Sequence, residues 1–215
     1  MKLPGAVGVS HLRVYDTEGP DGLAGGTPHL HTVCSEAYCV AAGRGAVQTL
    51  TPAGFAETPL APGVLVSFGP GTVHRLVNGG DLELFVVMAN AGLPEAGDLV
   101  VTVPDEVLDD PAAYSEVATV ATDAEARRRR DLGVEGFLRL KEGGAPALAE
   151  FQRRAVGIVR GRASAWKAVW EAGPVAATRE SGHHLAAVAA GDASHLAQAA
   201  VESAALGDVA ERRFG

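Results

Sequence analysis

The sequence predicts a mainly β fold with α, in which an antiparallel β-barrel of the jelly-roll type precedes an α-helical C-terminal region. Up to about residue 105, Gly and Pro recur between short segments rich in Val, Leu and Thr, a pattern typical of small all-β barrels. Beyond that point Ala, Arg and Glu dominate, and the apolar residues take a helical spacing. Charge divides at the same place, because only 4 of the 18 Lys and Arg residues precede position 106. We therefore expect two domains, at 1–105 and 106–215.

The barrel part contains about seven segments with strand character. A first strand is predicted at 7–16 and is followed by a loop rich in Gly and Pro at 16–26. Further strands are predicted at 28–32, 37–42, 46–51, 64–68, 73–78 and 82–90. Seven strands over this length suit a small antiparallel barrel.

The second part has the start signal and the apolar spacing of helices. Thr122 and Glu125 form a capping box, which predicts a helix start. A single helical stripe collects the apolar side chains of Leu148, Phe151, Ala155, Ile158, Val159, Trp166, Val169 and Trp170. Gly173 and Pro174 are expected to end that helix, and shorter helices are expected near 179–190 and 193–206. The stripe is too apolar to face water, so we expect it to pack on the barrel or at a homodimer interface.

Composition excludes several classes of protein. The net charge of -8 disfavours non-specific binding to nucleic acid or to an anionic membrane. Two cysteines, Cys34 and Cys39, are too few for a secreted disulfide scaffold. The sequence contains neither a signal-peptide pattern nor a run of about 18 apolar residues. We therefore expect a cytoplasmic protein with no membrane partner.

Two histidines and a glutamate have the spacing of a metal site. His29 and His31 are two residues apart on a predicted strand, so their side chains face the same way. The four residues between His31 and Glu36 can turn the chain, which lets the carboxylate point back into the same space. Imidazole and carboxylate groups that meet in a barrel can bind a metal ion. His74 follows a strand and a Gly-Pro-Gly turn, and is the fourth candidate.

These residues resemble the two sequence motifs of the cupin superfamily. The stretch from His29 to Gly43 matches H-x-H-x4-E-x6-G at every defined position. The stretch from Gly63 to Asn78 matches G-x5-P-x-G-x2-H-x3-N, except that the proline is Pro70 and stands one position late. The resemblance covers residues 7 to 92. It implies a small single-domain barrel that holds one divalent ion, of Fe, Mn, Ni, Zn or Cu, through His29, His31, Glu36 and His74.

Other candidate residues are weaker. Alternation from Glu36 places Tyr38 next to the metal, either as a packed barrel tyrosine or as a group that bonds a ligand or substrate. We interpret Cys34 as a turn residue rather than a ligand, and Cys39 as a packed outward residue. Residues 127–130, four consecutive arginines, are interpreted as a solvated helix face. Residues 183–184, two histidines, are interpreted as non-ligating. The pocket itself is expected to be apolar, without Arg or Lys.

The resemblance leaves the reaction open. With a redox-active ion, a cupin site can bring O2 and a substrate together, so a dioxygenase similar to quercetinases is the favoured function. The alternatives are an isomerase or lyase that uses the metal as a Lewis acid, and a non-catalytic cupin that binds a small ligand. Glu36 and Tyr38 are the catalytic candidates. A small-molecule substrate or ligand is the expected partner, and a homodimer is the expected assembly.

Overall fold

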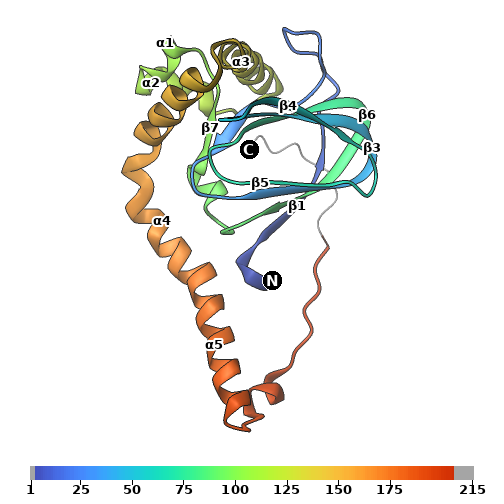
Figure 1. Cartoon of the computed structure of the whole chain (residues 1–215), viewed down its shortest axis with the longest axis vertical. Helices are drawn as coiled ribbons and strands as arrows, with labels where there is room; N and C mark the ends of the chain where they lie inside the picture. Colours follow the sequence, from blue (N-terminus) through green and yellow to red (C-terminus); the bar gives the residue numbers. More distant parts are fainter. Residues whose placement is uncertain (1–2, 206–215) are drawn as a thin grey trace.

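Two long strands, β3 (Glu36–Thr51) and β6 (Val73–Met88), frame the β-barrel in the computed structural model, which describes residues 3–205 (Figure 1). They pair antiparallel along almost their whole lengths. β4 (Gly54–Leu60) and β5 (Leu65–Phe68) pair with β3, whereas β1 (Gly8–Arg13) and β2 (His29–His31) pair with β6. β7 (Leu99–Val101) pairs with the free side of β2. The antiparallel barrel expected from the sequence is therefore present.

The strand boundaries differ from those expected. The segments predicted at 37–42 and 46–51 form one continuous strand, β3, and those at 73–78 and 82–90 form β6. The register of β3 shifts near Gly43, where φ is +71° and an added Cβ would lie 2.0 Å from the Asp81 carbonyl oxygen. Glycine at this bulge lets the strand bend without ending. The short strands β4 and β7 were not predicted.

The barrel interior is filled mainly by apolar side chains from alternate strand positions. The buried members of this core are Val14, Tyr38, Val40, Val47, Leu60, Leu76, Leu82, Leu84 and Val86. Asn78 closes one end, because its amide donates to the Val14 carbonyl and its carbonyl accepts from the Gly80 and Leu82 backbone N–H groups. The core fixes the strands, and the strands fix the direction of the side chains that form the candidate site.

The second half of the described chain is helical. Its α-helices are α1 (Asp105–Leu108), α2 (Pro111–Ala118), α3 (Asp123–Val159), α4 (Ala163–Trp170) and α5 (Ala176–Ala189). Short helical turns occur at η1 (Pro4–Ala6), η2 (Pro94–Asp98), η3 (Arg160–Arg162), η4 (Glu171–Val175) and η5 (Ser194–Gln198). The capping box of Thr122 and Glu125 opens α3 as predicted, and α3 is interrupted at Gly144. Gly173 and Pro174 do not stop the helical path, which continues through the wide turn η4 into α5.

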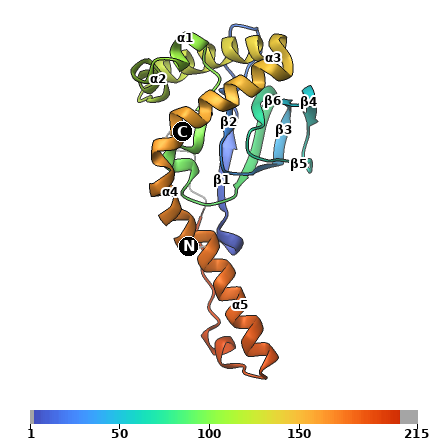
Figure 2. The same cartoon turned by 60° about the vertical axis from the view of Figure 1, so that its left-hand side comes forward.

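A second apolar core lies between the barrel and the helices, which line one side of the barrel (Figure 2). It joins Leu30 and Val100 of the barrel to Phe137, Phe151 and Trp166 of the helices. Most of the predicted apolar stripe is thus buried. The helices and the strands share this core, so the core does not separate two domains. The domain boundary near residue 105 remains a prediction.

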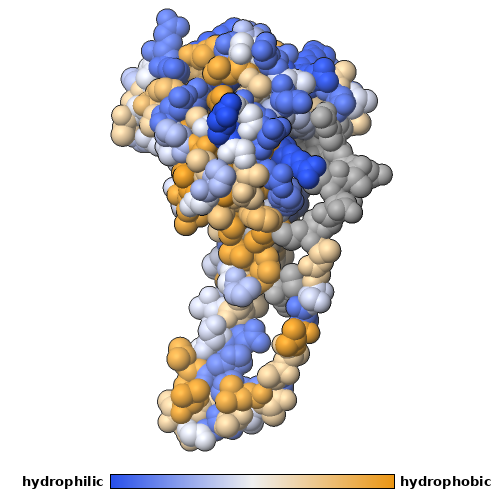
Figure 3. Space-filling model, turned by 90° about the vertical axis from the view of Figure 1, so that its right-hand side faces the viewer, coloured by the Kyte–Doolittle hydropathy of each residue, from blue (hydrophilic) through white to orange (hydrophobic). Residues whose placement is uncertain are grey.

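The end of the stripe and the helix beyond it leave the barrel. Trp170 is 45% exposed on the single chain, so the barrel does not bury it, and its packing at a homodimer interface remains a prediction. The reason is that α4 and α5 run away from the barrel, and α5 has no buried residue (Figures 1 and 2). Apolar and polar side chains are mixed on this projecting part (Figure 3). Within residues 3–205, no helix is long and apolar enough to cross a membrane.

Candidate metal centre

The four side chains expected from the sequence come together at one point. His29 and His31 lie on β2, Glu36 begins β3, and His74 lies near the start of β6. One potential ligand atom from each lies within 4.8 Å of the others. Strand register explains the meeting, because His29 pairs directly with His74 across β2 and β6, and His31 follows on the same side of β2. The cluster could hold a metal ion.

Hydrogen bonds orient two of the imidazoles. The Nδ1 atom of His29 lies 2.8 Å from the Thr27 carbonyl oxygen, and that of His74 lies 3.0 Å from the Thr72 carbonyl oxygen. Because a carbonyl oxygen only accepts, each Nδ1 carries the proton. Each Nε2 atom then keeps its lone pair for a metal, the tautomer found in histidine ligands that are fixed from behind.

The carboxylate of Glu36 faces the free nitrogens. Its Oε2 atom lies 3.0 Å from His74 Nε2 and 3.5 Å from His31 Nε2. Oε2 of Glu36 and Nε2 of His74 are both buried and have no hydrogen-bond partner in the described part of the chain. Burying such atoms without partners is costly. A divalent ion would satisfy both, and a set of three nitrogens and one oxygen suits Fe, Mn, Ni, Zn or Cu.

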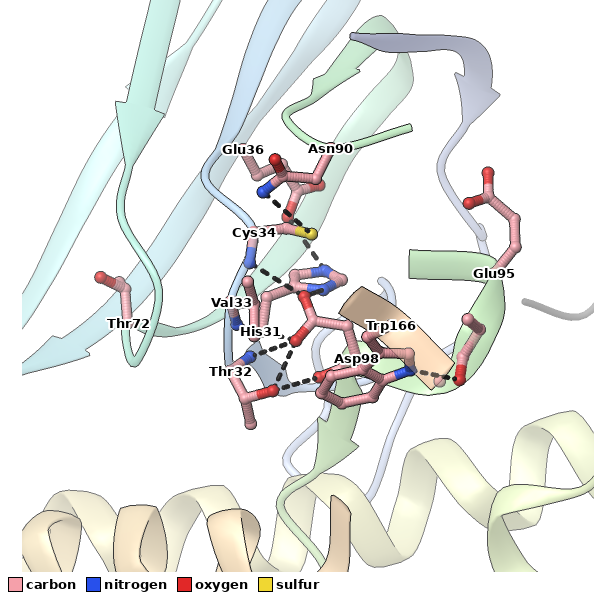
Figure 4. Close-up of polar contacts among 12 residues, drawn as sticks. His31, Thr32, Val33, Cys34, Glu36, Thr72, Asn90, Glu95, Asp98 and Trp166 are labelled. Carbon is pink, nitrogen blue, oxygen red and sulfur yellow. Dashed lines mark hydrogen bonds and ion pairs between the residues drawn. The ribbon is translucent and has the colours of Figure 1, made fainter. Parts of the chain in front are cut away.

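Asp98 supports the third histidine and was missed in the sequence. Its Oδ2 atom lies 3.3 Å from His31 Nδ1, on the side away from the cluster (Figure 4). Its carboxylate also accepts the backbone N–H groups of Thr32, Val33 and Cys34, at 2.9, 2.8 and 3.0 Å. Asp98 is fully buried and holds the turn between His31 and Glu36.

The surroundings shift the pKa values of three of these groups. Burial, reinforced by His74 and His31, lowers the pKa of His29 well below 6.5. Burial would raise the pKa of Glu36, but the neighbouring imidazoles of His74 and His31 outweigh burial and lower it. Burial opposes ionisation of Asp98 as well, yet its hydrogen bonds, beginning with His31, hold its pKa far below the ordinary value. The cluster therefore combines a neutral imidazole with ionised carboxylates, the protonation states that metal binding requires.

Tyr38 lies where strand alternation placed it. It is two residues along β3 from Glu36 and is almost fully buried, with its ring centroid 6.2 Å from that of His74. Burial and the neighbouring Glu36 carboxylate raise the pKa of the Tyr38 hydroxyl well above 10. The group is therefore a neutral phenol beside the cluster, able to donate a hydrogen bond.

The two cysteines lie outside the cluster. Cys34 is buried in the turn that Asp98 holds, and its Sγ atom lies 4.0 Å from Asn90 Nδ2. Burial raises the pKa of this thiol, which disfavours the thiolate that binds metals. Cys39 was expected to pack on the outside of the barrel, but it is exposed.

A cleft of 1110 Å³ lies between the barrel and the helices, with His31 on its wall. Its lining also includes Met88, Leu99, Tyr114, Arg129 and Ile158. The expectation of a pocket without Arg concerned the barrel interior. It does not hold for this cleft, because α3 brings Arg129 to its wall. The interpretation of 127–130 as a solvated face is wrong for Arg129 and Arg130, which are 8% and 5% exposed.

The topology and the cluster identify the barrel. The histidine pair and the glutamate lie on successive strands, β2 and β3, and the last histidine lies on β6 opposite the first. The barrel has the arrangement that the cupin resemblance predicts. Both cupin motifs thus converge on one point, and Pro70, one position late, does not displace His74 from the cluster.

No protein-family model matches the chain, and no curated protein matches it. Solved structures with similarity to this chain include the sugar 3,4-ketoisomerase QdtA from Thermoanaerobacterium thermosaccharolyticum in complex with TDP. It has 13% identity and a TM-score of 0.37, over 43% of this chain and 64% of that one. A variant of Pac13 from Streptomyces with uridine has 16% identity and a TM-score of 0.32, over 41% of this chain and 62% of that one.

A cupin protein from Bacteroides fragilis has 17% identity and a TM-score of 0.30, over 40% of this chain and 65% of that one. The chain thus spans a little over three-fifths of the length of these solved structures.

Proposed function

We propose that this protein is a metal-dependent cupin enzyme that isomerises, or removes water from, a small organic substrate. In this proposal His29, His31, Glu36 and His74 hold one divalent ion. The observation that supports it is the common orientation of the cluster: backbone carbonyls fix two imidazoles with Nε2 free, and the buried Oε2 atom of Glu36 lacks a hydrogen-bond partner in the described chain.

The chemistry divides between the ion and the protein. When bound, the ion would act as a Lewis acid that polarises a carbonyl or hydroxyl oxygen of the substrate. Tyr38 would supply the proton, since burial keeps its hydroxyl protonated next to the cluster. Glu36 would be both a ligand and a positioning group, because its carboxylate neighbours the Tyr38 hydroxyl and helps to raise the pKa of that hydroxyl.

This proposal reverses the order of preference drawn from the sequence, where a dioxygenase was favoured. Isomerisation and dehydration both require protons to move at carbon or oxygen. The Tyr38–Glu36 pair therefore favours this class of reaction. QdtA is named a sugar ketoisomerase and Pac13 a nucleoside dehydratase, reactions of this class, although these likenesses concern the fold.

The test begins with protein purified without added metal and then loaded with each candidate ion. Deuterium incorporation and water loss would be followed by NMR in a panel of hydroxy and oxo compounds, with oxygen uptake measured in parallel. We expect turnover without oxygen uptake. Oxygen consumption that depends on substrate would instead establish a dioxygenase, and tight ligand binding without turnover would establish a non-catalytic cupin.

A further inference from the structure

Close contact between α3 and the barrel determines where Arg129 lies. An added Cβ at Gly136 would lie 1.7 Å from the Thr102 carbonyl oxygen, so only glycine permits this approach. The Thr102 hydroxyl lies 2.7 Å from the Gly133 carbonyl oxygen and 3.1 Å from the Pro28 carbonyl oxygen. Pro28 immediately precedes β2. The helix turn that follows Arg129 is therefore pinned to the segment that carries His29 and His31.

Arg129 is a buried guanidinium without a counter-ion. It is 8% exposed, and its Nε atom has no hydrogen-bond partner in the part of the chain that the structure describes. Its one hydrogen bond among residues 3–205 is long, 3.4 Å from Nη1 to the Ala118 carbonyl oxygen. Among residues 3–205, no carboxylate lies within ion-pair distance of it.

Neighbouring arginines show that this is unusual for the chain. Arg130 bonds the carbonyl oxygens of Thr17 and Glu18 and pairs with Asp131. Arg154, on the same cleft, pairs with Asp105, Asp109 and Glu150. Both of these guanidinium groups have carboxylate partners, although Arg154 Nη1 also lacks a hydrogen bond within the described residues. Arg129 has no carboxylate partner among residues 3–205.

The cleft connects this charge with the cluster. His31 and Arg129 line the same 1110 Å³ space, and apolar side chains including Met88, Leu99 and Ile158 line much of the wall. Leaving a buried charge unpaired costs several kcal/mol. An anionic group that enters the cleft would recover part of that cost, because guanidinium forms bidentate, charge-assisted hydrogen bonds with carboxylate and phosphate.

We propose that Arg129 binds the anionic group, carboxylate or phosphate, of a substrate that lies in this cleft with its reacting end towards His31. The inference rests on the proposed function, since it names the substrate class for the same site. It assigns a binding role to the helical region, which supplies the anion site while the barrel supplies the metal cluster.

The experiment measures anion binding to metal-free protein, so that its outcome does not depend on catalysis. Inorganic phosphate and succinate are titrated separately into chelator-treated wild type, Arg129→Gln and Arg129→Lys by calorimetry. Arg128→Gln is the matched control, because Arg128 is the preceding residue and its side chain is 71% exposed. We expect Arg129→Gln to weaken binding about tenfold or more, the loss of one charge-assisted interaction. Arg129→Lys should retain part of the affinity, and Arg128→Gln should retain all of it.

The two anions distinguish the two possible anionic groups of the substrate. Preference for phosphate indicates a phosphorylated substrate, and preference for succinate indicates a carboxylic acid. Wild type that binds neither anion, or Arg129→Gln that binds as well as wild type, would overturn the inference. Metal content is measured on separate samples of the four proteins that are loaded with a divalent ion and desalted, and it is expected to be equal in all four. Loss of anion binding with normal metal content therefore separates this inference from the proposed metal site.

Thermal unfolding of the same variants excludes a merely structural role. If Arg129 served only to bond Ala118, Arg129→Gln should lower the melting temperature without added anion. We expect an unchanged or higher melting temperature, because the variant removes an unpaired buried charge.

Discussion

Asp98 Oδ2 lies 3.3 Å from His31 Nδ1, joining a helical turn after the barrel's last long strand to a side chain on β2. The contact depends on β7, which pairs with β2 and brings Asp98 beside the turn from His31 to Glu36. A carboxylate behind a histidine fixes the ring orientation and raises its basicity. Asp98 is thus expected to determine how well His31 binds metal.

Asp98→Asn should weaken metal binding about 10- to 100-fold, the usual effect of losing such a partner. It should also lower the free energy of unfolding by about 1–3 kcal/mol, because the amide cannot accept all the hydrogen bonds that the carboxylate accepts. Competition with a metal-sensitive chelator measures the first effect, and urea denaturation the second. Glu106→Gln, at an exposed position, is the control. Unchanged metal affinity in Asp98→Asn would show that Asp98 does not support His31.

Tyr38→Phe should keep its metal but lose turnover by about 10²- to 10⁴-fold, the range for removing a general acid. The phenyl ring preserves packing inside the barrel, so the variant should fold. Metal content and turnover are measured on the same preparation. Full activity in Tyr38→Phe would assign Tyr38 to packing alone, the other role that the sequence left open.

Acid should destabilise the metal-free protein. The folded state lowers the pKa of His29, so below about pH 6.5 the unfolded chain binds the proton and the folded chain does not. The free energy of unfolding should therefore fall with pH, by up to about 1.4 kcal/mol per unit for one proton. Glu36 and Asp98, whose folded pKa values are lowered, add a loss of the same sign at more acidic pH.

Urea denaturation of chelator-treated protein between pH 7 and pH 4 measures this dependence. His29→Gln should flatten the slope just below pH 6.5, and His183→Gln, on the exposed α5, should leave it unchanged. A stability that stayed constant or rose towards pH 4 would contradict the burial of His29 as a neutral imidazole.

Trp166 and Trp170 should differ in their contribution to stability, although both lie on one helix. Trp166 is 6% exposed in the core between barrel and helices, and its Nε1 donates to the Ala96 carbonyl oxygen. Trp166→Ala should cost about 3–5 kcal/mol. Trp170→Ala should change the free energy of unfolding by less than about 1 kcal/mol, because Trp170 is 45% exposed. Equal effects in urea denaturation would contradict the packing described here.

The sequence predicted the barrel and the cluster because both depend on local spacing. His29 and His31 are two apart on a strand, and Glu36 follows one turn later, so alternation alone brings them together. His74 is remote, but it resembles a cupin motif with its own spacing. The role of these residues as ligands remains a proposal, as does the homodimer.

Asp98 and Arg129 could not be found in this way. Neither has a local pattern that distinguishes it from other charged residues in turns and helices. Asp98 reaches His31 only through the pairing of β7 with β2, and Arg129 becomes buried only because Gly133 and Gly136 let α3 approach the barrel. The bulge at Gly43 also explains why the sequence predicted two strands where the structure has the single strand β3, because the bulge interrupts the alternation of side chains.

Metal analysis tests the central claim most directly. Wild type, His74→Ala and His184→Ala are loaded with each divalent ion, desalted and analysed by plasma mass spectrometry, with circular dichroism to verify folding. We predict one ion per chain in wild type and in His184→Ala, whose substitution lies on exposed α5, and almost none in folded His74→Ala. Wild-type metal content in folded His74→Ala, or no bound ion in loaded wild type, would contradict the metal site.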